Sequence, residues 1–249
     1  MNGAMPLPPL RTGCAGWSLP RKLWPEFPSE GSHLERYAQR FDAVEIDTSF
    51  YRPHRRETYE RWASSTPDVF RFAVKLPKTV THELRLAGAM PAFDEFLSQV
   101  AGLHDKLGCL VVQLPPSLAF DAGVARRFLA DVRRRHEGAV ALEPRHRSWF
   151  SPEAEALLSR FLVGRVLADP VLFDEAAAPG GWPGLAYLRL HGSPRRYWSA
   201  YDDALLERLA SRLRLAQGDG AECWCVFDNT AGGEAVGNAI TLSRLLQNR

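Results

Sequence analysis

Acidic, basic and imidazole side chains recur at the ends of short apolar segments along this chain, where they could carry out acid–base chemistry. Glu45, Lys75, Glu143 and His191 each stand at or near the end of such a segment. Carboxylates, amines and imidazoles transfer protons when a fold holds them beside a substrate. This pattern favours an enzyme with Glu45, Lys75, Glu143 and His191 as its catalytic residues, provided that the fold brings these positions together.

The apolar segments themselves predict the fold. They occupy residues 12–15, 43–47, 70–75, 109–113, 140–143, 165–169, 187–191 and 223–229. Helical patterns separate most of them, and strand–helix repeats of this kind are typical of an α/β fold. We therefore predict a single (β/α)8 TIM-like barrel, in which functional side chains gather at the carboxyl ends of the strands. Residues 169–184 are rich in Pro, Gly and Ala, so the sixth helix is expected to be short or missing.

Capping residues mark several of the predicted helices. Ser32 with Glu35 forms a capping-box pattern before the first helix, and Asp121 precedes another helix. Ser151 followed by Pro152 is a further start signal. A longer helix is predicted over residues 91–107, because Phe93, Phe96 and Val100 fall on one helical face.

Length and composition agree with one soluble domain. The chain has 249 residues, 45% of them hydrophobic and 24% charged, with a formal net charge of +2. We expect residues 1–10 to form a disordered N-terminal extension and residues 11–249 to form the barrel domain. No segment is long and apolar enough to span a membrane, and the expected location is the cytoplasm. The sequence does not indicate an oligomeric state.

Strand periodicity predicts which side chains share the barrel interior. Residues two apart on a strand face the same side, and on each strand the aliphatic face is expected to meet the helices. The other face carries small residues and then a polar one. This places Glu45, Asp47, Lys75, Gln113, Glu143, Arg189 and His191 around one space. The alternative to a functional site is a self-satisfied network in which Glu45 pairs with Lys75 and Glu143 pairs with Arg189.

Eight motifs in order resemble the YecE-like family, known as domain of unknown function 72. They lie at residues 13–18, 44–51, 70–75, 81–82, 113–116, 143–150, 189–192 and 227–229. The resemblance implies a TIM-like barrel and brings no established activity. Asp47 and Asp228 stand where the family pattern usually has Asn. Each of these two departures adds a negative charge to the predicted site.

The interpretation that we favour is a hydrolase or lyase that acts on a phosphorylated, sugar-like or nucleotide substrate. Glu143 would be a general acid or base, and His191 a second proton-transfer group. Lys75, Arg145 and Arg189 would hold an anion, with help from the backbone of Gly232 and Gly233. A Schiff-base role for Lys75 is disfavoured, because nearby carboxylates would keep it charged.

Further positions are predicted to contact the substrate from strand ends and loops. They are Trp17, Asp47, Tyr51, His82, Gln113, Arg145, His146, Trp149, Arg189, Asp228 and Asn229. The aromatic members could form a stacking wall, or they could simply plug the end of the barrel.

Two other classes of function stay open on the sequence alone. A divalent metal has ligand types available in Glu45, Asp47, Glu143, His146, Asp169, His191 and Asp228. No close ligand motif joins them, so a metal is not favoured and no cofactor is identified. A nucleic-acid-binding protein, or a metal-dependent nuclease, would use the arginine and aromatic residues of three loops, Arg52–Arg56, Arg145–Arg147 and Arg195–Tyr201.

Overall fold

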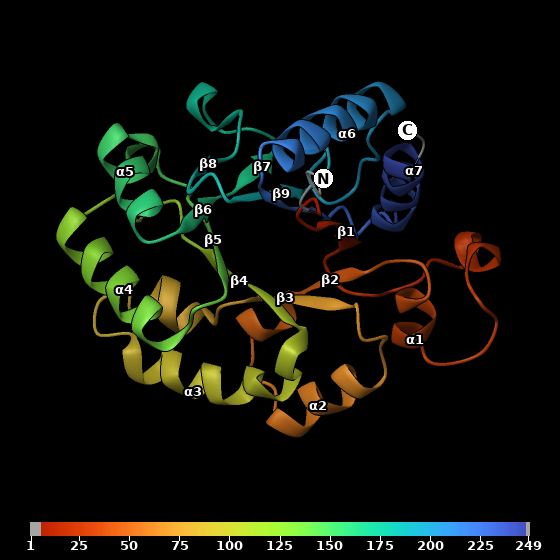
Figure 1. Ribbon diagram of the computed structural model, residues 1–249, viewed down its shortest axis with the longest axis horizontal. Coiled ribbons are helices and arrows are strands. Elements are labelled where there is room, and N and C mark those ends of the chain that lie inside the picture. The colour runs from red at the N-terminus through yellow and green to blue at the C-terminus, as the bar shows by residue number, and fades with distance from the viewer. Residues whose placement is uncertain (1–5, 248–249) are drawn as a thin grey trace, which may run out of the picture.

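Parallel strands lie at the centre of the molecule with helices packed around them (Figure 1). The computed structural model describes residues 6–247. Its strands are β1 (Leu10–Cys14), β2 (Ala43–Ile46), β3 (Arg71–Lys75), β4 (Leu107–Gln113), β5 (Ala139–Glu143), β6 (Val163–Arg165), β7 (Leu167–Asp169), β8 (Gly180–Gly181), β9 (Leu185–Leu190) and β10 (Glu222–Phe227). Its α-helices are α1 (His33–Ala38), α2 (Arg56–Ser64), α3 (Met90–Val100), α4 (Ala122–Arg135), α5 (Pro152–Arg160), α6 (Asp203–Gly218) and α7 (Ala235–Gln247).

The strands pair in two sheets. One has four strands in the order β1-β10-β9-β7, and the other has six in the order β2-β3-β4-β5-β6-β8. Every pairing is parallel except that of the short strand β8 with β6. Helices connect most successive strands, as parallel pairing requires. The structure is therefore an α/β fold with parallel sheets.

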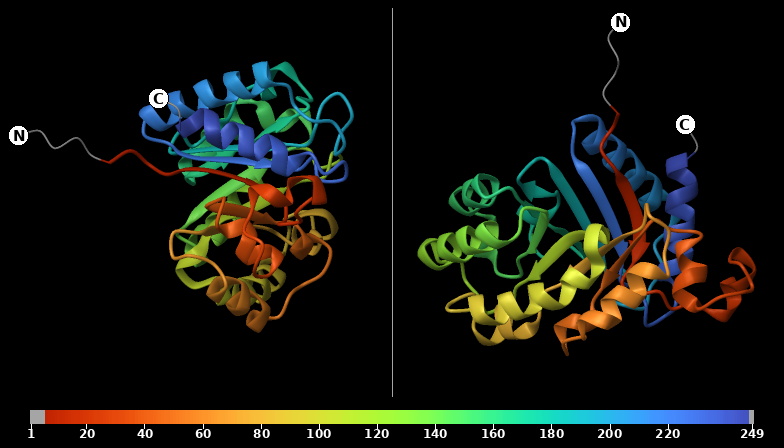
Figure 2. Two further views of the ribbon diagram at one scale, coloured as in Figure 1. Left: turned by 90° about the vertical axis from the view of Figure 1, so that its right-hand side faces the viewer. Right: turned by 60° about the horizontal axis from the view of Figure 1, so that its bottom comes forward.

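The two sheets meet edge to edge at two junctions. Figure 2 shows the arrangement of the sheets from two further directions. At the first junction Ala15 forms an isolated parallel bridge with Glu45, and the Gly16 amide donates to the Glu45 carbonyl at 2.9 Å. At the second, only Val166 separates β6, which pairs with β5, from β7, which pairs with β9. Regular pairing stops at both junctions, so the arrangement is consistent with a barrel without being a continuous one.

The split between β6 and β7 corrects the expectation of one strand over residues 165–169. The Val166 amide donates to the Leu142 carbonyl at 2.9 Å, which continues the pairing on the β5 side by one residue. The chain then pairs with the other sheet through β7. The predicted strand is divided because its first half hydrogen-bonds with β5 and its second half with β9.

Two separate apolar clusters confirm the predicted alternation of strand faces. The outer cluster joins strands to helices and includes Val44, Val74 and Leu142. The inner cluster draws on both sheets, with Ala43, Ala73, Cys109, Val111 and Ala141 from one and Leu185, Tyr187, Trp224 and Val226 from the other. The two sheets therefore enclose a common interior.

The helices begin at the predicted capping residues, but one predicted helix is shorter than expected and another is missing. Ser32 and Glu35 make both hydrogen bonds of the capping box, and Asp121 accepts from the Val124 amide at 2.8 Å. The helix predicted over residues 91–107 ends as an α-helix at Val100 and continues as a 3-10 helix. In residues 170–184, all of them described, the helical structure is limited to the 3-10 helix Asp174–Ala176, so the α-helix expected between the sixth and seventh predicted strands is missing.

The predicted boundary of the N-terminal extension falls within ordered backbone. Leu10 begins β1, and the Pro9 carbonyl accepts from the Cys223 amide at 2.9 Å. Residues 1–5 of the predicted extension lie outside the described residues. Over residues 6–247, no helix has the length and apolar character needed to cross a bilayer.

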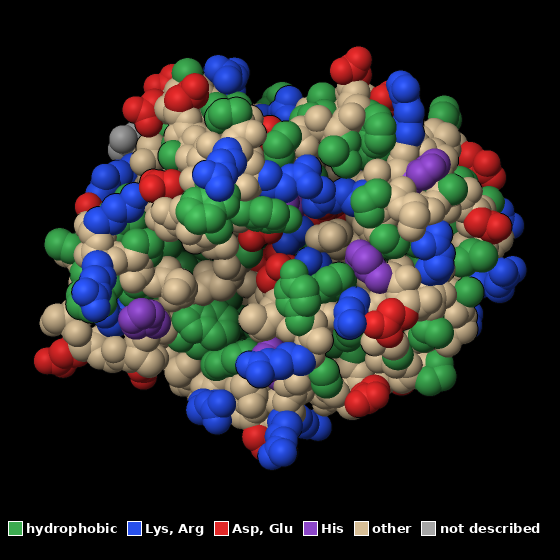
Figure 3. All heavy atoms as spheres, turned by 180° about the vertical axis from the view of Figure 1, so that it is seen from behind, with side chains coloured by type: hydrophobic (Ala, Val, Ile, Leu, Met, Phe, Trp, Pro, Cys, Tyr) green, Lys and Arg blue, Asp and Glu red, His purple; other side chains and the backbone are tan. Residues whose placement is uncertain are grey.

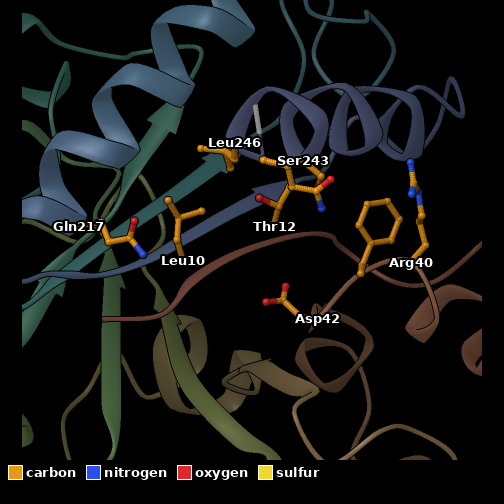
Figure 4. A pocket seen from close by; sticks show the side chains of 9 residues that line it. Leu10, Thr12, Arg40, Asp42, Gln217, Ser243 and Leu246 are labelled. Atoms are coloured by element: carbon orange, nitrogen blue, oxygen red, sulfur yellow. The ribbon is translucent and has the colours of Figure 1, made fainter. Parts of the chain in front are cut away.

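A polar cavity of about 400 Å³ lies at the amino end of β1 (Figure 4). Leu10 and Thr12 reach it from β1, and Ser243 and Leu246 reach it from α7. Asp42 also lines the cavity and forms a 3.8 Å ion pair with Arg11. The cavity therefore lies at the opposite end of the strand from the residues predicted to do chemistry.

Tyr37 of α1 connects the two sheets where their regular pairing stops. Its hydroxyl donates to the Ala43 carbonyl of β2 at 2.9 Å and accepts from the Cys14 amide of β1 at 2.8 Å. Tyr37 is completely buried. Gly13 must stay small beside it, because a Cβ there would lie 2.1 Å from the Ala43 carbonyl oxygen and 2.9 Å from the Tyr37 hydroxyl.

We predict that Tyr37→Phe lowers the free energy of unfolding by about 3 kcal/mol, because it leaves two buried backbone groups without partners. Denaturant unfolding monitored by circular dichroism measures the change. Tyr51→Phe is the matched control, since Tyr51 is 70% exposed and its loss of a hydroxyl should change the stability by less than about 0.5 kcal/mol. A Tyr37→Phe variant as stable as the parent would contradict the role of this hydroxyl.

Candidate functional site

The polar residues predicted to converge do meet at the carboxyl ends of the strands. Lys75, Gln113 and Glu143 are the last residues of β3, β4 and β5. Asp47, His191 and Asp228 lie just beyond β2, β9 and β10. Hydrogen bonds and ion pairs join these residues across both sheets. We call this group, together with Glu45, Arg145 and Arg189, the strand-end cluster.

Arg189 forms the centre of the strand-end cluster and is completely buried. Its Nε lies 3.0 Å from Glu45 Oε1, and its Nη2 lies 2.5 Å from the same oxygen. Its Nη1 donates to Glu143 Oε2 at 2.6 Å and to Gln113 Oε1 at 3.2 Å. Buried charges persist only where partners of opposite charge and hydrogen bonds replace water. Arg189 therefore holds two buried carboxylates from different strands.

Tyr187 extends this buried layer and was absent from the predicted site residues. Its hydroxyl donates to Glu45 Oε2 at 2.8 Å, and its ring stacks on Trp224 with 5.8 Å between ring centroids. It precedes Arg189 by two positions on β9, so strand alternation already placed the two side chains on one face. Tyr187 thus supports Glu45 from the interior.

A second layer of the cluster reaches solvent. The Asp47 side chain is 26% exposed and pairs with Lys75 at 3.0 Å. Lys75 also lies over the Phe50 ring, with its Nζ 4.2 Å from the ring centroid. The pairing of Glu45 with Lys75, one alternative from the sequence, is therefore wrong, whereas the pairing of Glu143 with Arg189 is confirmed.

His191 is a neutral imidazole in this arrangement. Burial, together with the nearby Arg189 and Arg145, lowers the pKa of His191 to about 3, although Glu143 opposes the shift. Its Nδ1 lies 3.2 Å from the Arg189 carbonyl oxygen, and its Nε2 lies 3.0 Å from Arg145 Nη2. Because the carbonyl can only accept and the guanidinium can only donate, the proton belongs on Nδ1.

Two carboxyl groups near His191 Nε2 have opposite pKa shifts. Burial favours the protonated form of Glu143, but Arg189 and Arg145 more than compensate and hold the pKa of Glu143 well below its usual range. Burial, with repulsion from Asp47 and Glu45, raises the pKa of Asp228 to about 7 despite the attraction of Arg189. His191 Nε2 lies 3.9 Å from an oxygen of each.

These shifts change the proton-transfer roles predicted from the sequence. Glu143 stays ionised, as expected, but a carboxylate with so low a pKa is a weak base at neutral pH. Asp228, predicted only as a binding residue, has the pKa that suits proton transfer near neutrality. Composition and spacing carry no information about this shift, because burial and the neighbouring charges cause it.

The charges of the strand-end cluster nearly cancel. Four carboxyl groups, Glu45, Asp47, Glu143 and Asp228, face three cations, Lys75, Arg145 and Arg189. Protonation of Asp228 makes the balance even. Figure 3 shows basic and acidic side chains together in a hollow near the centre of one face, with hydrophobic side chains around it. An excess of positive charge for an anionic substrate is therefore absent from the cluster itself.

Other predicted contact residues divide into two groups. Tyr51 is exposed, and it and His82 pack edge-on against Phe50 beside Lys75, with ring centroids 5.0 and 4.9 Å from that of Phe50. Trp17 packs against Trp62 at 5.0 Å and belongs to the margin of the outer apolar cluster. The first two lie near the cluster, whereas the contacts of Trp17 are with helix α2.

Three predicted contact residues have structural partners of their own. Trp149 is 2% exposed, and its Nε1 donates to the Leu118 carbonyl at 2.9 Å. His146 accepts from the Ser148 amide and caps the 3-10 helix Arg147–Phe150. Asn229 is buried and donates to the Ser199 carbonyl and to Asn238 Oδ1, both at 2.9 Å. Their contacts account for these residues as parts of the framework, and a role in substrate binding stays a prediction.

The metal-ligand types named from the sequence do not form a metal-binding arrangement. Within residues 6–247, no three His, Cys, Asp or Glu side chains are grouped so that they could hold a metal ion. Arg189 instead occupies oxygens of Glu45 and Glu143. The donor set is thus organised around a guanidinium.

Fold and site together define an α/β protein with an arginine-centred cluster at its strand ends. Residues 11–249 match the model of the family described as protein of unknown function DUF72, and the chain belongs to this family. This confirms the resemblance seen in the motifs.

Relatives and solved structures agree with the assignment. The chain is 27% identical to UPF0759 protein YunF of Bacillus subtilis, over 94% of this chain and 93% of that protein. It is 32% identical to UPF0759 protein YecE of Escherichia coli K12, over 55% of this chain and 52% of the relative. DUF72 family proteins of Enterococcus faecalis V583 and Thermotoga maritima MSB8 share the fold, with TM-scores of 0.80 and 0.79 at 22% and 23% identity. The first alignment covers 96% of both chains, and the second covers 96% of this chain and 100% of the other.

We predict that Arg189→Met lowers the free energy of unfolding by about 3–5 kcal/mol, because Glu45 and Glu143 lose their buried partner. Urea unfolding at pH 7 measures the loss. Arg147→Met is the control, since it removes an exposed ion pair with Glu175 and should change the stability by less than about 1 kcal/mol. Equal effects of the two substitutions would show that Arg189 is not central.

Because the pKa of Asp228 is raised, we predict that Asp228→Asn stabilises the protein more at high pH than at low pH. The folded protein binds a proton that the unfolded chain releases between about pH 4 and pH 7, so this group loses its stabilising effect as the pH rises through that window. His191 titrates in the opposite sense at lower pH, and the comparison with the parent removes its contribution. Denaturant unfolding at pH 5 and at pH 8 measures the free energy of unfolding of both proteins. The difference, variant minus parent, should increase by about 2–4 kcal/mol from pH 5 to pH 8. The same difference in stability between variant and parent at both pH values would contradict the raised pKa of Asp228.

Proposed function

We propose that this protein is a hydrolase or lyase that uses acid–base chemistry on a sugar-like substrate at the carboxyl ends of its strands. The observation that carries the proposal is a pair of carboxyl groups, Glu143 and Asp228, that have opposite pKa shifts and each lie 3.9 Å from His191 Nε2. Titratable groups whose surroundings push their pKa values apart are the usual arrangement for an acid and an anion of one reaction.

Asp228 is the proton-transfer group of this proposal. Burial raises its pKa to about 7, so near neutral pH it can donate a proton to a leaving oxygen and take one back from water. Its side chain is 11% exposed, in contrast to the fully buried Glu45 and Glu143. Asp228 is therefore the most accessible of these three carboxyl groups.

Glu143 and His191 would support the reaction without exchanging protons with solvent at neutral pH. Glu143 is fully buried and pairs with both Arg189 and Arg145, so it would hold these two guanidinium groups in place beneath the substrate. The neutral His191 accepts from Arg145 and so fixes the position of that guanidinium. Arg145 in turn pairs with Glu143.

The charge balance of the cluster favours a neutral polyhydroxy substrate over an anion. Asp47, Gln113 and Lys75 provide acceptors and donors at the solvent side, which suit pairs of hydroxyl groups. An anionic group would have to compete with carboxylates that already occupy each cation. A sugar-like ligand needs no such exchange.

A phosphorylated or nucleic-acid ligand is the second candidate, supported by one loop. The Arg195 guanidinium lies over the Trp198 ring, 4.5 Å from its centroid, and Trp198 is 48% exposed. Arginine beside an exposed aromatic residue can bind phosphate and stack on a base. Binding of a single-stranded oligonucleotide that weakens steeply with salt would favour this candidate.

The proposal also treats the two sheets as one closed barrel. The inner apolar cluster shared by both sheets supports closure, and so do the backbone contacts at Ala15 and Val166. A closed barrel would present the strand-end cluster as a single bowl to which several strands contribute, as barrel enzymes do.

A panel of nitrophenyl pyranosides tests the proposed activity. We predict that the parent releases nitrophenol from at least one member, that the rate falls as the pH rises above about 7, and that Asp228→Asn lowers it about 100-fold or more. Asp219→Asn, an exposed position, is the control and should keep the parental rate. No release from the whole panel, or an unchanged rate in Asp228→Asn, would contradict the proposal.

A further inference from the structure

Tyr197 lies over the strand-end cluster from the loop between β9 and α6. Its ring centroid is 5.8 Å from that of His191, and the two planes are inclined by 48°. The side chain is 42% exposed. The ring thus packs against His191 while part of its surface stays open to solvent.

The backbone holds Tyr197 in a conformation that costs free energy. Its φ of 67° lies in the left-handed region, where bulky residues are uncommon and glycine is free of strain. Its amide donates to the His191 carbonyl, and its carbonyl accepts from the Gly232 amide at 3.2 Å. These bonds fix the backbone of Tyr197. Backbone strain of this kind is concentrated at active sites and ligand-binding sites.

The groups that face Tyr197 are those of the strand-end cluster. Partial burial raises the pKa of the Tyr197 hydroxyl, Asp228 raises it further, and Arg145, Arg196 and Arg189 oppose the shift. The hydroxyl therefore stays protonated and can both donate and accept a hydrogen bond. Its ring packs against His191, whose Nε2 lies 3.9 Å from Asp228.

Two other exposed aromatic residues, Trp198 and Tyr51, are less well placed for a ligand ring. Arg195 already covers the Trp198 ring. Tyr51 is 70% exposed and lies beside Phe50, on the Lys75 side of the cluster. Tyr197 differs from both because it contacts His191 directly.

We propose that Tyr197 is a ligand-contact residue whose ring stacks on the C–H face of a pyranose ring and holds that sugar against Asp228. This inference rests on the proposed function and adds the ring form of the substrate and the residue that selects it. The negative face of an aromatic ring attracts the weakly positive C–H groups of a sugar. An open-chain polyol or a free phosphate offers no such face.

Glycine at position 197 separates this role from a structural one. Tyr197→Gly relieves the left-handed strain, so we expect an unchanged or higher melting temperature. We also expect the affinity for the tightest-binding member of a panel of methyl pyranosides to fall about tenfold or more, because ring stacking contributes about 1.4 kcal/mol. Titration calorimetry with the panel, with inorganic phosphate and sorbitol as further probes, measures the affinities. Tyr197→Phe, which keeps the ring, should bind within about threefold of the parent.

Leu162→Gly is the matched control, because Leu162 has a φ of 55°, is 49% exposed and precedes β6. It should gain stability in the same way and bind the pyranoside as the parent does. A Tyr197→Gly variant with parental affinity would overturn the role of Tyr197 and leave the proposed function in place. Equal binding of sorbitol and the pyranoside would overturn the ring form. A parent that binds no pyranoside would overturn both this inference and the sugar-like substrate.

Discussion

The buried guanidinium of Arg189 is the interaction on which the rest of this structure depends. It belongs to β9 in one sheet, and its carboxylate partners Glu45 and Glu143 belong to β2 and β5 in the other. Either carboxylate alone in this interior would be strongly destabilising. The same cation therefore joins the two sheets and sets the ionisation of the groups above it. Arg189 thus contributes both to the stability of the fold and to the pKa values of Glu143 and Asp228.

Much of the site could be predicted because strand alternation is a strict geometric rule. Glu45, Lys75, Gln113, Glu143, Arg189 and His191 share a space because each lies on the inward face near a strand end. Tyr187 obeys the same rule and could have been included. The capping residues Ser32 and Asp121 also marked helix starts, since their hydrogen bonds are local.

What the sequence could not predict depends on contacts between distant segments. The break at Val166 arises because its neighbours pair with different sheets. The choice of Asp47 over Glu45 as the partner of Lys75 depends on distances that alternation does not define. The pKa of Asp228 depends on burial and on four charged neighbours, and the position of Tyr197 depends on a loop with no repeating pattern.

The distance along the chain between Glu45 and Arg189 has a consequence for synthesis. The two residues are 144 positions apart, and Glu143 precedes Arg189 by 46. While the ribosome makes the chain from its N-terminus, Glu143 is followed at once by its second cation Arg145, whereas Glu45 exists for several seconds before Arg189 is made. Burial of Glu45 without Arg189 would be too costly, and its other partner, Tyr187, also lies on β9. The carboxylate of Glu45 can therefore leave water only after β9 has been made, so the last third of the chain decides when the interior around it can close.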